Sequence, residues 1–168
     1  KVSQLEDLSL LIDRNHNFWR HTPTIIPLRS RALSDRYGMR KDPFSRKKAF
    51  HGGLDFKAKR GSPVYAPSDG IVRTASRKRG FGLLVELQHG RGFFPGKKKT
   101  VRYRTRFAHL SKINVRRGQK IKRGDLIGLV GSTGRSTGPH LHYQVWKNNK
   151  YVDAMKEKMP RNKVLPSS

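Results

Sequence analysis

The sequence predicts an all-β domain preceded by a short helix, and two observations carry this prediction. From about residue 28 onward, glycines interrupt short runs rich in Val, Ile, Leu, Tyr and Phe, whereas helical periodicity is weak. Short apolar strands separated by glycine-containing turns are typical of a sandwich or an open barrel. The chain has 168 residues, of which 34% are hydrophobic, so it is long enough for one domain with a core.

The N-terminal segment carries the signals of a helix. Ser3-Gln-Leu-Glu6 fits a capping box, and Leu5, Leu8 and Ile12 follow at the spacing of an apolar helical stripe. Two interpretations stay open: these are the last turns of a longer coiled coil, or a short helix docked on the domain. Either one places a helix before the β region.

Proline and composition set the expected boundaries. Thr22-Pro23 begins an extended linker, because residues that precede proline avoid the helical region. We therefore expect an N-terminal helical segment with linker over residues 1–22 and the main β domain over residues 23–160. A basic C-terminal tail is expected over residues 161–168.

Two turns in the β region are expected to form hairpins. Ser68-Asp69-Gly70 separates two apolar runs within residues 64–72. Arg123-Gly124-Asp125 lies in the middle of residues 120–130 and predicts a second hairpin. Residues 91–100, which contain a Pro-Gly pair and three lysines, are expected to form an exposed loop.

The charge is strongly positive and unevenly placed. The formal net charge is +27, and no acidic residue occurs between Glu86 and Asp125. Such a field attracts polyanions and accelerates their encounter with the protein. Nucleic acid, anionic cell-wall polymer and acidic lipid all fit this property, and charge alone does not choose among them.

The absence of cysteine restricts the chemistry. Disulfides and thiolate metal sites are excluded, so a metal would be held by His, Asp or Glu. The first residue is Lys1, which is consistent with a processed product that has lost an upstream signal peptide or membrane anchor.

Two short histidine motifs carry the most specific signal. On a strand, residues two or four apart face the same side, so His51-Gly-Gly-Leu-Asp55 and His140-Leu-His142 can each aim two polar side chains at one point. Two imidazoles and a carboxylate form a ligand set that suits zinc with one position open for water. The spacing leaves open whether His140 or His142 binds the metal. The other imidazole is then placed to accept a proton from the water or to orient it.

The remaining histidines are less informative. His109, in Phe107-Ala-His-Leu-Ser111, is a further candidate for the same pocket, because its alternating neighbours predict a strand. A single histidine on a strand is usually an ordinary, partly buried side chain, and we interpret His16, His21 and His89 as surplus. The metal site is favoured by the conjunction of two separate motifs in a cysteine-free β domain.

These motifs resemble those of the lysostaphin-like (LytM-type) zinc metallopeptidases, which cut the peptide part of bacterial peptidoglycan. The resemblance covers roughly residues 23–155. It rests on six stretches of the chain: Ser34–Phe44, Phe50–Asp55, Gly61–Gly70, Phe107–Ser111, Gly118–Gly128 and Gly131–His142.

The resemblance implies a specific site. His51, Asp55 and His142 would be the Zn²⁺ ligands, and His109 and His140 would be catalytic histidines that orient or deprotonate the water. It also implies a mainly antiparallel, two-layer β fold with the site in a groove between loops.

The chain departs from the family in two places. Phe107 stands where the family often has Tyr. The stretch between Glu86 and Phe107 is also longer and more basic than is usual. Neither departure involves an expected ligand.

We therefore expect a zinc-dependent endopeptidase that hydrolyses peptide cross-links of peptidoglycan, with the D,D-bond favoured. Its location would be the cell envelope, periplasmic or extracellular, where the basic surface would hold it on an anionic polymer. Anchoring to the envelope membrane would come from a segment upstream of this sequence.

Two alternatives compete with this hypothesis. A non-catalytic relative that binds the cell wall and activates an amidase would usually have lost zinc ligands, whereas this chain keeps the full set. A nucleic-acid-binding module is suggested by charge, with Phe93, Phe94, Tyr103 and Phe107 as stacking platforms between basic residues.

Overall fold

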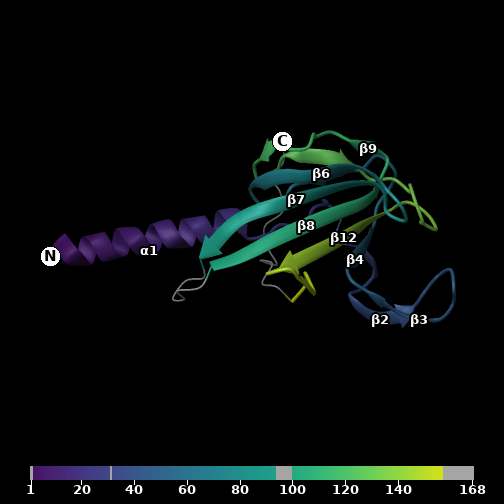
Figure 1. Ribbon diagram of the computed structural model, residues 1–168, viewed down its shortest axis with the longest axis horizontal. Coiled ribbons are helices and arrows are strands. Elements are labelled where there is room, and N and C mark those ends of the chain that lie inside the picture. Colours follow the sequence, from purple (N-terminus) through teal and green to yellow (C-terminus); the bar gives the residue numbers. More distant parts are fainter. Residues whose placement is uncertain (1, 31, 94–99, 157–168) are drawn as a thin grey trace.

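The computed structural model describes residues 2–30, 32–93 and 100–156. Its one helix, α1 (Val2–His21), leaves one end of a β domain, as Figure 1 shows. The strands within the described residues are β1 (Leu33–Asp35), β2 (Gly38–Lys41), β3 (Lys48–His51), β4 (Leu54–Lys57), β5 (Pro63–Tyr65), β6 (Gly70–Lys78), β7 (Gly82–Phe93), β8 (Thr100–Leu110), β9 (Lys112–Ile113), β10 (Lys120–Ile121), β11 (Leu126–Leu129), β12 (His140–Lys147) and β13 (Lys150–Val152).

The strands form one large sheet and two small ones. The large sheet has the order β1-β4-β12-β8-β7-β6-β10, and β13 pairs with the C-terminal end of β12. A three-stranded sheet has the order β5-β11-β9, and β2 and β3 form a separate hairpin. All strand pairs are antiparallel.

A single apolar cluster joins the large sheet to the three-stranded sheet. Val64 of β5 and Ile127 of β11 lie in the same core as Leu87, Phe107 and Val145 of the large sheet, and all five are buried. The two sheets therefore pack as layers, because burying these side chains between them removes apolar surface from water. The predicted all-β, mainly antiparallel fold with a short N-terminal helix is confirmed.

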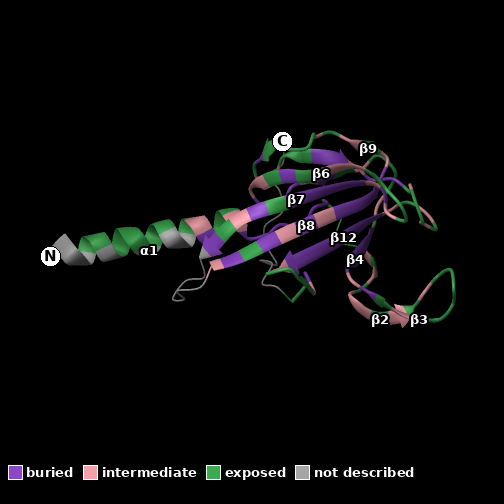
Figure 2. Ribbon diagram, viewed as in Figure 1, coloured by how far each residue is buried: buried purple, intermediate pink, exposed green. Residues whose placement is uncertain are grey.

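Helix α1 packs on the domain only through its last turns. Phe18 is buried, and its backbone approaches Gly92 of β7. The predicted apolar stripe points into solvent instead, since Leu5, Leu8 and Ile12 are 69%, 54% and 60% exposed (Figure 2). No helix in the described part of the chain is both long enough and apolar enough to cross a membrane.

Both predicted hairpins are wrong, because each turn carries the chain from one sheet to another. β5 pairs with β11 whereas β6 pairs with β7 and β10. The two turns instead bond to each other: the Ala66 N–H donates to the Asp125 carbonyl at 2.9 Å, and the Gly124 N–H donates to the Ala66 carbonyl at 2.8 Å. This mutual pairing satisfies backbone groups that a hairpin would have satisfied locally.

Three further expectations concern segments that lie partly or wholly outside the described residues. The two ends of the loop predicted over residues 91–100 are strand instead, since β7 continues to Phe93 and β8 begins at Thr100; residues 94–99 lie outside the described residues. The predicted tail over residues 161–168 also lies outside them. Of the proposed stacking aromatics, Tyr103 and Phe107 are buried and unavailable to bases, and Phe94 lies outside the described residues.

Candidate metal centre

The centre of the large sheet brings the two histidine motifs together. Strand β12 lies between β4 and β8, and its His142 is opposite Asp55 on β4 and Ala108 on β8. Directly opposed residues of antiparallel strands have Cβ atoms roughly 4.5–5.5 Å apart. The register therefore places His142 beside Asp55, with His109 one residue beyond Ala108.

The first motif is not a single strand, which corrects the prediction that His51 and Asp55 share one strand face. His51 ends β3, Asp55 lies in β4, and the two glycines between them carry the chain from the β2–β3 hairpin into the large sheet. A Cβ on Gly53 would lie 2.6 Å from the Tyr143 carbonyl oxygen, so only glycine permits this approach to β12. The two side chains still meet, but they do so through a change of sheet.

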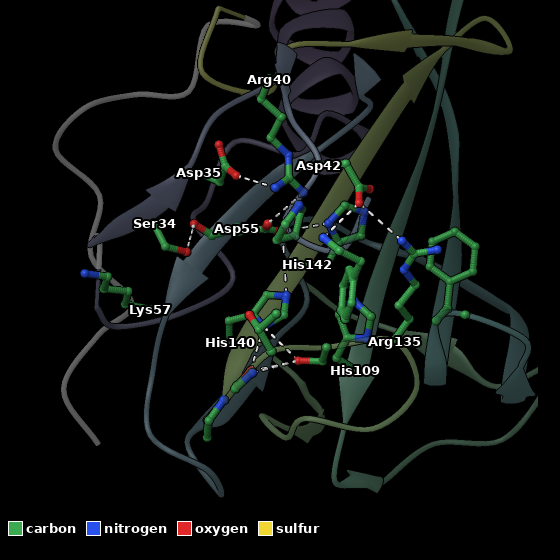
Figure 3. Close-up of a pocket in the computed structure, with 18 residues that line it drawn as sticks. Ser34, Asp35, Arg40, Asp42, Asp55, Lys57, His109, Arg135, His140 and His142 are labelled. Carbon is green, nitrogen blue, oxygen red and sulfur yellow. Dashed lines mark hydrogen bonds and ion pairs between the residues drawn. The ribbon is translucent and has the colours of Figure 1, made fainter. Parts of the chain in front are cut away.

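His51, Asp55 and His142 form a compact triangle of potential ligand atoms (Figure 3 shows the pocket around Asp55 and His142). Asp55 Oδ1 lies 2.7 Å from His142 Nδ1 and 3.3 Å from His51 Nε2, and the two nitrogens are 3.2 Å apart. A tetrahedral zinc with bonds of about 2.0–2.1 Å requires its ligand atoms to lie about 3.3 Å apart. Two edges of the triangle therefore have the length expected for a zinc tetrahedron, and the third, between Asp55 and His142, is shorter because these two atoms are hydrogen-bonded to each other.

The hydrogen bond behind His51 supports the same conclusion. Its Nδ1 lies 2.8 Å from the Arg36 carbonyl oxygen, which can only accept, so Nδ1 carries the ring proton and Nε2 presents a lone pair. Metal-bound histidines commonly donate their other N–H to a carbonyl in this way. The lone pair of Nε2 points towards a carboxylate and a second imidazole nitrogen, and a cation between them would satisfy all three.

The electrostatics favour the metal-binding forms of Asp55 and His142. Burial opposes ionisation of Asp55, but its contacts with the His142 and His51 imidazoles outweigh burial and hold the pKa of the carboxyl well below its usual range. Burial lowers the pKa of the His142 imidazole, whereas at His51 burial is outweighed by the Asp55 carboxylate and the Arg36 carbonyl, which raise the pKa. An ionised carboxylate and neutral imidazoles are the forms that bind a metal, so a cation has to displace any proton held by His51 Nε2.

His109 is held beside the triangle in an unusual backbone conformation. Its φ is +60°, in the left-handed region, and its N–H donates to the Phe81 carbonyl at 2.8 Å. Its ring Nδ1 donates to the Thr133 carbonyl at 2.8 Å, which leaves Nε2 free to accept a proton. Burial lowers the pKa of His109 to about 4, so the ring is neutral near pH 7. Strained residues of this kind gather at functional sites.

His140 completes the histidine cluster from the start of β12. Its Nδ1 lies 2.8 Å from the Gly138 carbonyl oxygen and therefore carries the proton. Its Nε2 is 3.9 Å from Asp55 Oδ1, and its ring centroid is 4.8 Å from that of His109. The structure thus brings all five predicted site residues into one cluster, of which Asp55, His109, His140 and His142 line a pocket. Of the histidines interpreted as surplus, His89 is buried elsewhere in the sheet.

The pocket is a groove of about 520 Å³, and two loops form its walls. One wall is the turn between β2 and β3, which contains Asp42 and Phe44, and the other is the segment before β12. Arg135 joins the walls, since its guanidinium lies 3.2 Å from Asp42 and 4.4 Å from the Phe44 ring centroid. The predicted position of the site in a groove between loops agrees with this arrangement.

Two arginines that the histidine motifs alone did not reveal support the site. The Arg40 guanidinium lies 2.6 Å from Asp35 and 3.7 Å from Asp55 Oδ2, so it can hold the carboxylate oxygen that faces away from the histidines (Figure 3). Arg40 belongs to Ser34–Phe44, one of the stretches that carried the family resemblance, and that membership was the available signal.

Arg106 acts from behind the site. It contacts Glu86 at 2.6 Å and donates to the Gln144 side-chain oxygen at 3.0 Å, and Gln144 donates in turn to the Gly52 carbonyl at 3.3 Å. The same guanidinium lies 4.5 Å from the ring centroid of Phe81, whose carbonyl holds His109. No local pattern could identify this network, because its members meet only through the register of β7, β8 and β12.

Comparison with known proteins gives a consistent result. The model of peptidase family M23 matches residues 49–154. The peptidoglycan DD-endopeptidase ShyA of Vibrio cholerae is 42% identical over 127 residues, which is 76% of this chain and 27% of that protein. The DD-carboxypeptidase/endopeptidase Mpg of Neisseria meningitidis is 37% identical over 136 residues, which is 81% of this chain and 29% of that protein.

Solved structures show the same fold. A zinc-containing peptidase from Vibrio cholerae superposes with a TM-score of 0.66 at 35% identity, covering 82% of this chain and 41% of that one. The catalytic domain of lysostaphin from Staphylococcus simulans gives a TM-score of 0.61 at 34% identity, covering 73% of this chain and 88% of that one.

The chain spans less than a third of the length of the two curated relatives compared above. The matched part nevertheless includes every residue of the histidine cluster. Since the family model covers well over half of the sequence, the chain belongs to peptidase family M23.

Proposed function

We propose that this protein is a zinc-dependent endopeptidase that hydrolyses peptide cross-links of bacterial peptidoglycan. The observation that carries the proposal is the compact triangle of His51, Asp55 and His142, whose potential ligand atoms lie 2.7–3.3 Å apart. The names of the relatives compared above support peptidoglycan as the substrate and the D,D-bond as the bond cut. The cell envelope, periplasmic or extracellular, is the compartment that this substrate implies.

In this proposal His51 Nε2, Asp55 Oδ1 and His142 Nδ1 would hold the zinc. Bound zinc would lower the pKa of its water towards about 7 and polarise the scissile carbonyl. Arg40 would hold the outer oxygen of Asp55 and keep Oδ1 turned towards the ligand position.

His109 and His140 are the proposed catalytic histidines. Each carries its proton on Nδ1, where a backbone carbonyl accepts it, and each presents Nε2 as a base. A neutral Nε2 in the pocket can accept a proton from the attacking water and return it to the leaving amine. Because two such rings lie side by side, one can act as the base while the other orients the water or the developing oxyanion.

The fully retained ligand set also argues against the amidase-activator hypothesis. A pure activator needs a binding surface, and nothing in that role requires three ligand atoms at zinc spacing beside two further imidazoles. The buried positions of Tyr103 and Phe107 likewise weaken the nucleic-acid hypothesis.

The test is digestion of purified, cross-linked muropeptide dimers followed by mass spectrometry, with and without a chelator. We expect monomers of a mass that identifies the D,D-bond, loss of cleavage with chelator, and recovery with added Zn²⁺. His142→Ala should lose both bound zinc and cleavage, whereas His16→Ala, which changes an exposed histidine on α1, should keep both. Cleavage that survives in folded His142→Ala would refute the zinc role.

A further inference from the structure

The end of the large sheet opposite the histidine cluster contains a second hollow, of about 770 Å³. It lies among the end of α1, the first residues of β6, the later part of β7, the start of β8 and the segment that leads into β10. Arg102 lines this hollow and His109 lines the groove, and both are on β8. Arg102 and His109 are seven positions apart along the strand, which corresponds to a distance of about 23 Å. The hollow is therefore a separate site.

Apart from Arg20, the arginines and lysines that line the hollow have no anionic partner among the described residues. Its single carboxylate, Asp69, is already occupied by Arg20 at 3.0 Å and by the backbone N–H of Arg123 at 2.9 Å. Six further cationic side chains line it, and none of them forms an ion pair with another described residue: Arg73, Arg91, Arg102, Arg117, Lys120 and Lys122.

This convergence of like charges is unfavourable for the folded protein by itself. Each cation repels the others, and the compact state concentrates them in one place. The six side chains come from β6, β7, β8 and the segment around β10, so no single sequence run accounts for the cluster. An anion that contacts several of them would remove the repulsion and gain charge-assisted hydrogen bonds.

The hollow also has an apolar component, which a small anion or a bare polyanion would not use. Ile71 is 49% exposed in it, and the side chains of Val72 and Ile121 form buried parts of its lining. The turn before Ile71 is fixed from behind by His89, which bonds to Ser68 and to the Asp69 carbonyl. A ligand with phosphate groups next to an apolar body fits both parts of this surface.

A further exposed apolar side chain lies at the same end of the domain, on helix α1. Helix α1 ends at His21, which lines the hollow, and Trp19 near this end of the helix is 40% exposed. Figure 1 shows the helix leaving the domain. Exposed apolar side chains close to a basic cluster are the combination that binds the interface of an anionic bilayer.

We propose that the basic hollow, defined by Arg73, Arg91, Arg102, Arg117, Lys120 and Lys122, binds the phosphate headgroups of an anionic phospholipid surface. Bound in this way, the protein presents the histidine groove at the opposite end of β8, directed away from the membrane. The proposal concerns where the protein is held, and it is independent of the reaction in the groove.

The test is co-sedimentation of the full 168-residue chain with vesicles at physiological salt. Neutral phosphatidylcholine vesicles are compared with vesicles that contain about one-third phosphatidylglycerol. The hollow variant carries Arg73→Gln, Lys120→Gln and Lys122→Gln. The matched control carries Lys48→Gln, Lys59→Gln and Arg60→Gln, which removes the same charge from exposed positions outside the hollow.

We expect wild type and control to bind the anionic vesicles with affinities within about twofold, and the hollow variant to bind at least tenfold more weakly, since each basic residue near such a surface contributes roughly 1 kcal/mol. Ile71→Ser should weaken vesicle binding severalfold. Cleavage of soluble muropeptide dimers should be equal in all variants, which separates this proposal from the peptidase function.

Two results would overturn the proposal. An equal loss of binding in the hollow variant and the control would mean that the overall charge of the protein, and not the hollow, attracts the vesicles. Complete displacement by millimolar tripolyphosphate, together with normal vesicle binding by Ile71→Ser, would show a site for bare polyphosphate and refute the lipid assignment.

Discussion

The two ends of the large sheet use charged side chains in opposite ways. At the histidine end, Asp55 contacts three histidines and Arg40, Glu86 contacts Arg106, and Asp42 contacts Arg135. At the hollow end, six cations have no ion-pair partner among the described residues, and the one carboxylate in the lining is bound by Arg20 and the Arg123 N–H. The difference is one of pairing, since charged residues are abundant at both ends.

Pairing determines what each end can do. A buried or half-buried ion pair with good geometry fixes the positions of its atoms, which a metal site requires to within a fraction of an ångström. Unpaired exposed cations fix no geometry but produce a strong local field, which attracts a ligand whose detailed shape can vary. The first end is suited to chemistry and the second to attachment.

The largest effect should follow from removing the charge at the centre of the paired end. Asp55→Asn keeps the shape of the side chain but removes the anion that contacts His51 and His142. We expect zinc binding and muropeptide cleavage to fall below detection, measured by metal analysis and mass spectrometry. Stoichiometric zinc in this variant would show that the carboxylate is not a ligand.

A large effect is also expected one step behind the site. Arg106→Met leaves the buried Glu86 carboxylate without its ion-pair partner, which should reduce the free energy of unfolding by about 3 kcal/mol. It should also reduce kcat by roughly 10- to 100-fold, because Gln144 and Phe81 lose the group that positions them. Urea unfolding and steady-state kinetics measure the two effects.

The matched control for this prediction is Arg104→Met. Arg104 stacks 4.4 Å from the Trp146 ring centroid on the same sheet face, and it acts on Glu86 through its charge, whereas Arg106 also forms hydrogen bonds with Glu86. It should change kcat less than about twofold. In the double variant with Glu86→Leu, stability should recover while kcat stays low; full recovery of kcat would reduce Arg106 to a purely structural role.

A smaller, pH-dependent effect is expected near the hollow. Burial lowers the pKa of His89 from 6.5 to about 4. Between these values the unfolded chain binds a proton that the folded protein refuses, so stability falls as the pH drops from 6.5 towards 4. The loss should reach roughly 3 kcal/mol and stop below about pH 4.

His89→Gln isolates this contribution, because glutamine can still bond to Ser68 or Thr105 but does not titrate in this range. Unfolding free energies of both proteins, measured from pH 8 to pH 4, give the difference. Parallel curves would mean that His89 does not control the acid sensitivity of this region.

The smallest effect should come from an unpaired cation. Arg73→Gln removes a charge that has no partner among the described residues, so the free energy of unfolding should change by no more than about 0.5 kcal/mol. Thermal and urea unfolding would test this. A loss as large as that of Arg106→Met would contradict the contrast between the two ends.

The site could be predicted from the sequence largely because strand periodicity is local. His140 and His142 share a face of β12 whatever the strand pairs with, and the glycine-separated apolar runs predicted a β fold. Which of the two histidines lies with His51 and Asp55 depended on the register of β4, β12 and β8, so the motif spacing could not decide it.

The failed predictions share a different cause. Turn residues such as Ser68-Asp69-Gly70 reverse the chain whether the next strand joins the same sheet or another one, so their chemistry does not distinguish a hairpin from a sheet change. Between His51 and Asp55 the chain likewise passes from one sheet to another, and the spacing of the motif does not indicate this change. The Arg106 network required contacts between residues distant in sequence, and no local pattern encodes them.

The position of β12 has a consequence for the order of events in the life of the chain. This strand is among the last of the described strands, yet it lies between β4 and β8 and contributes one corner of the ligand triangle. During synthesis, a chain that ends at residue 139 contains His51 and Asp55 but lacks His142. The edges of β4 and β8 that pair with β12 in the finished domain are still unpaired at that stage. The metal centre can therefore form only when almost the whole domain has been made, so a nascent or C-terminally truncated chain has no assembled peptidase site.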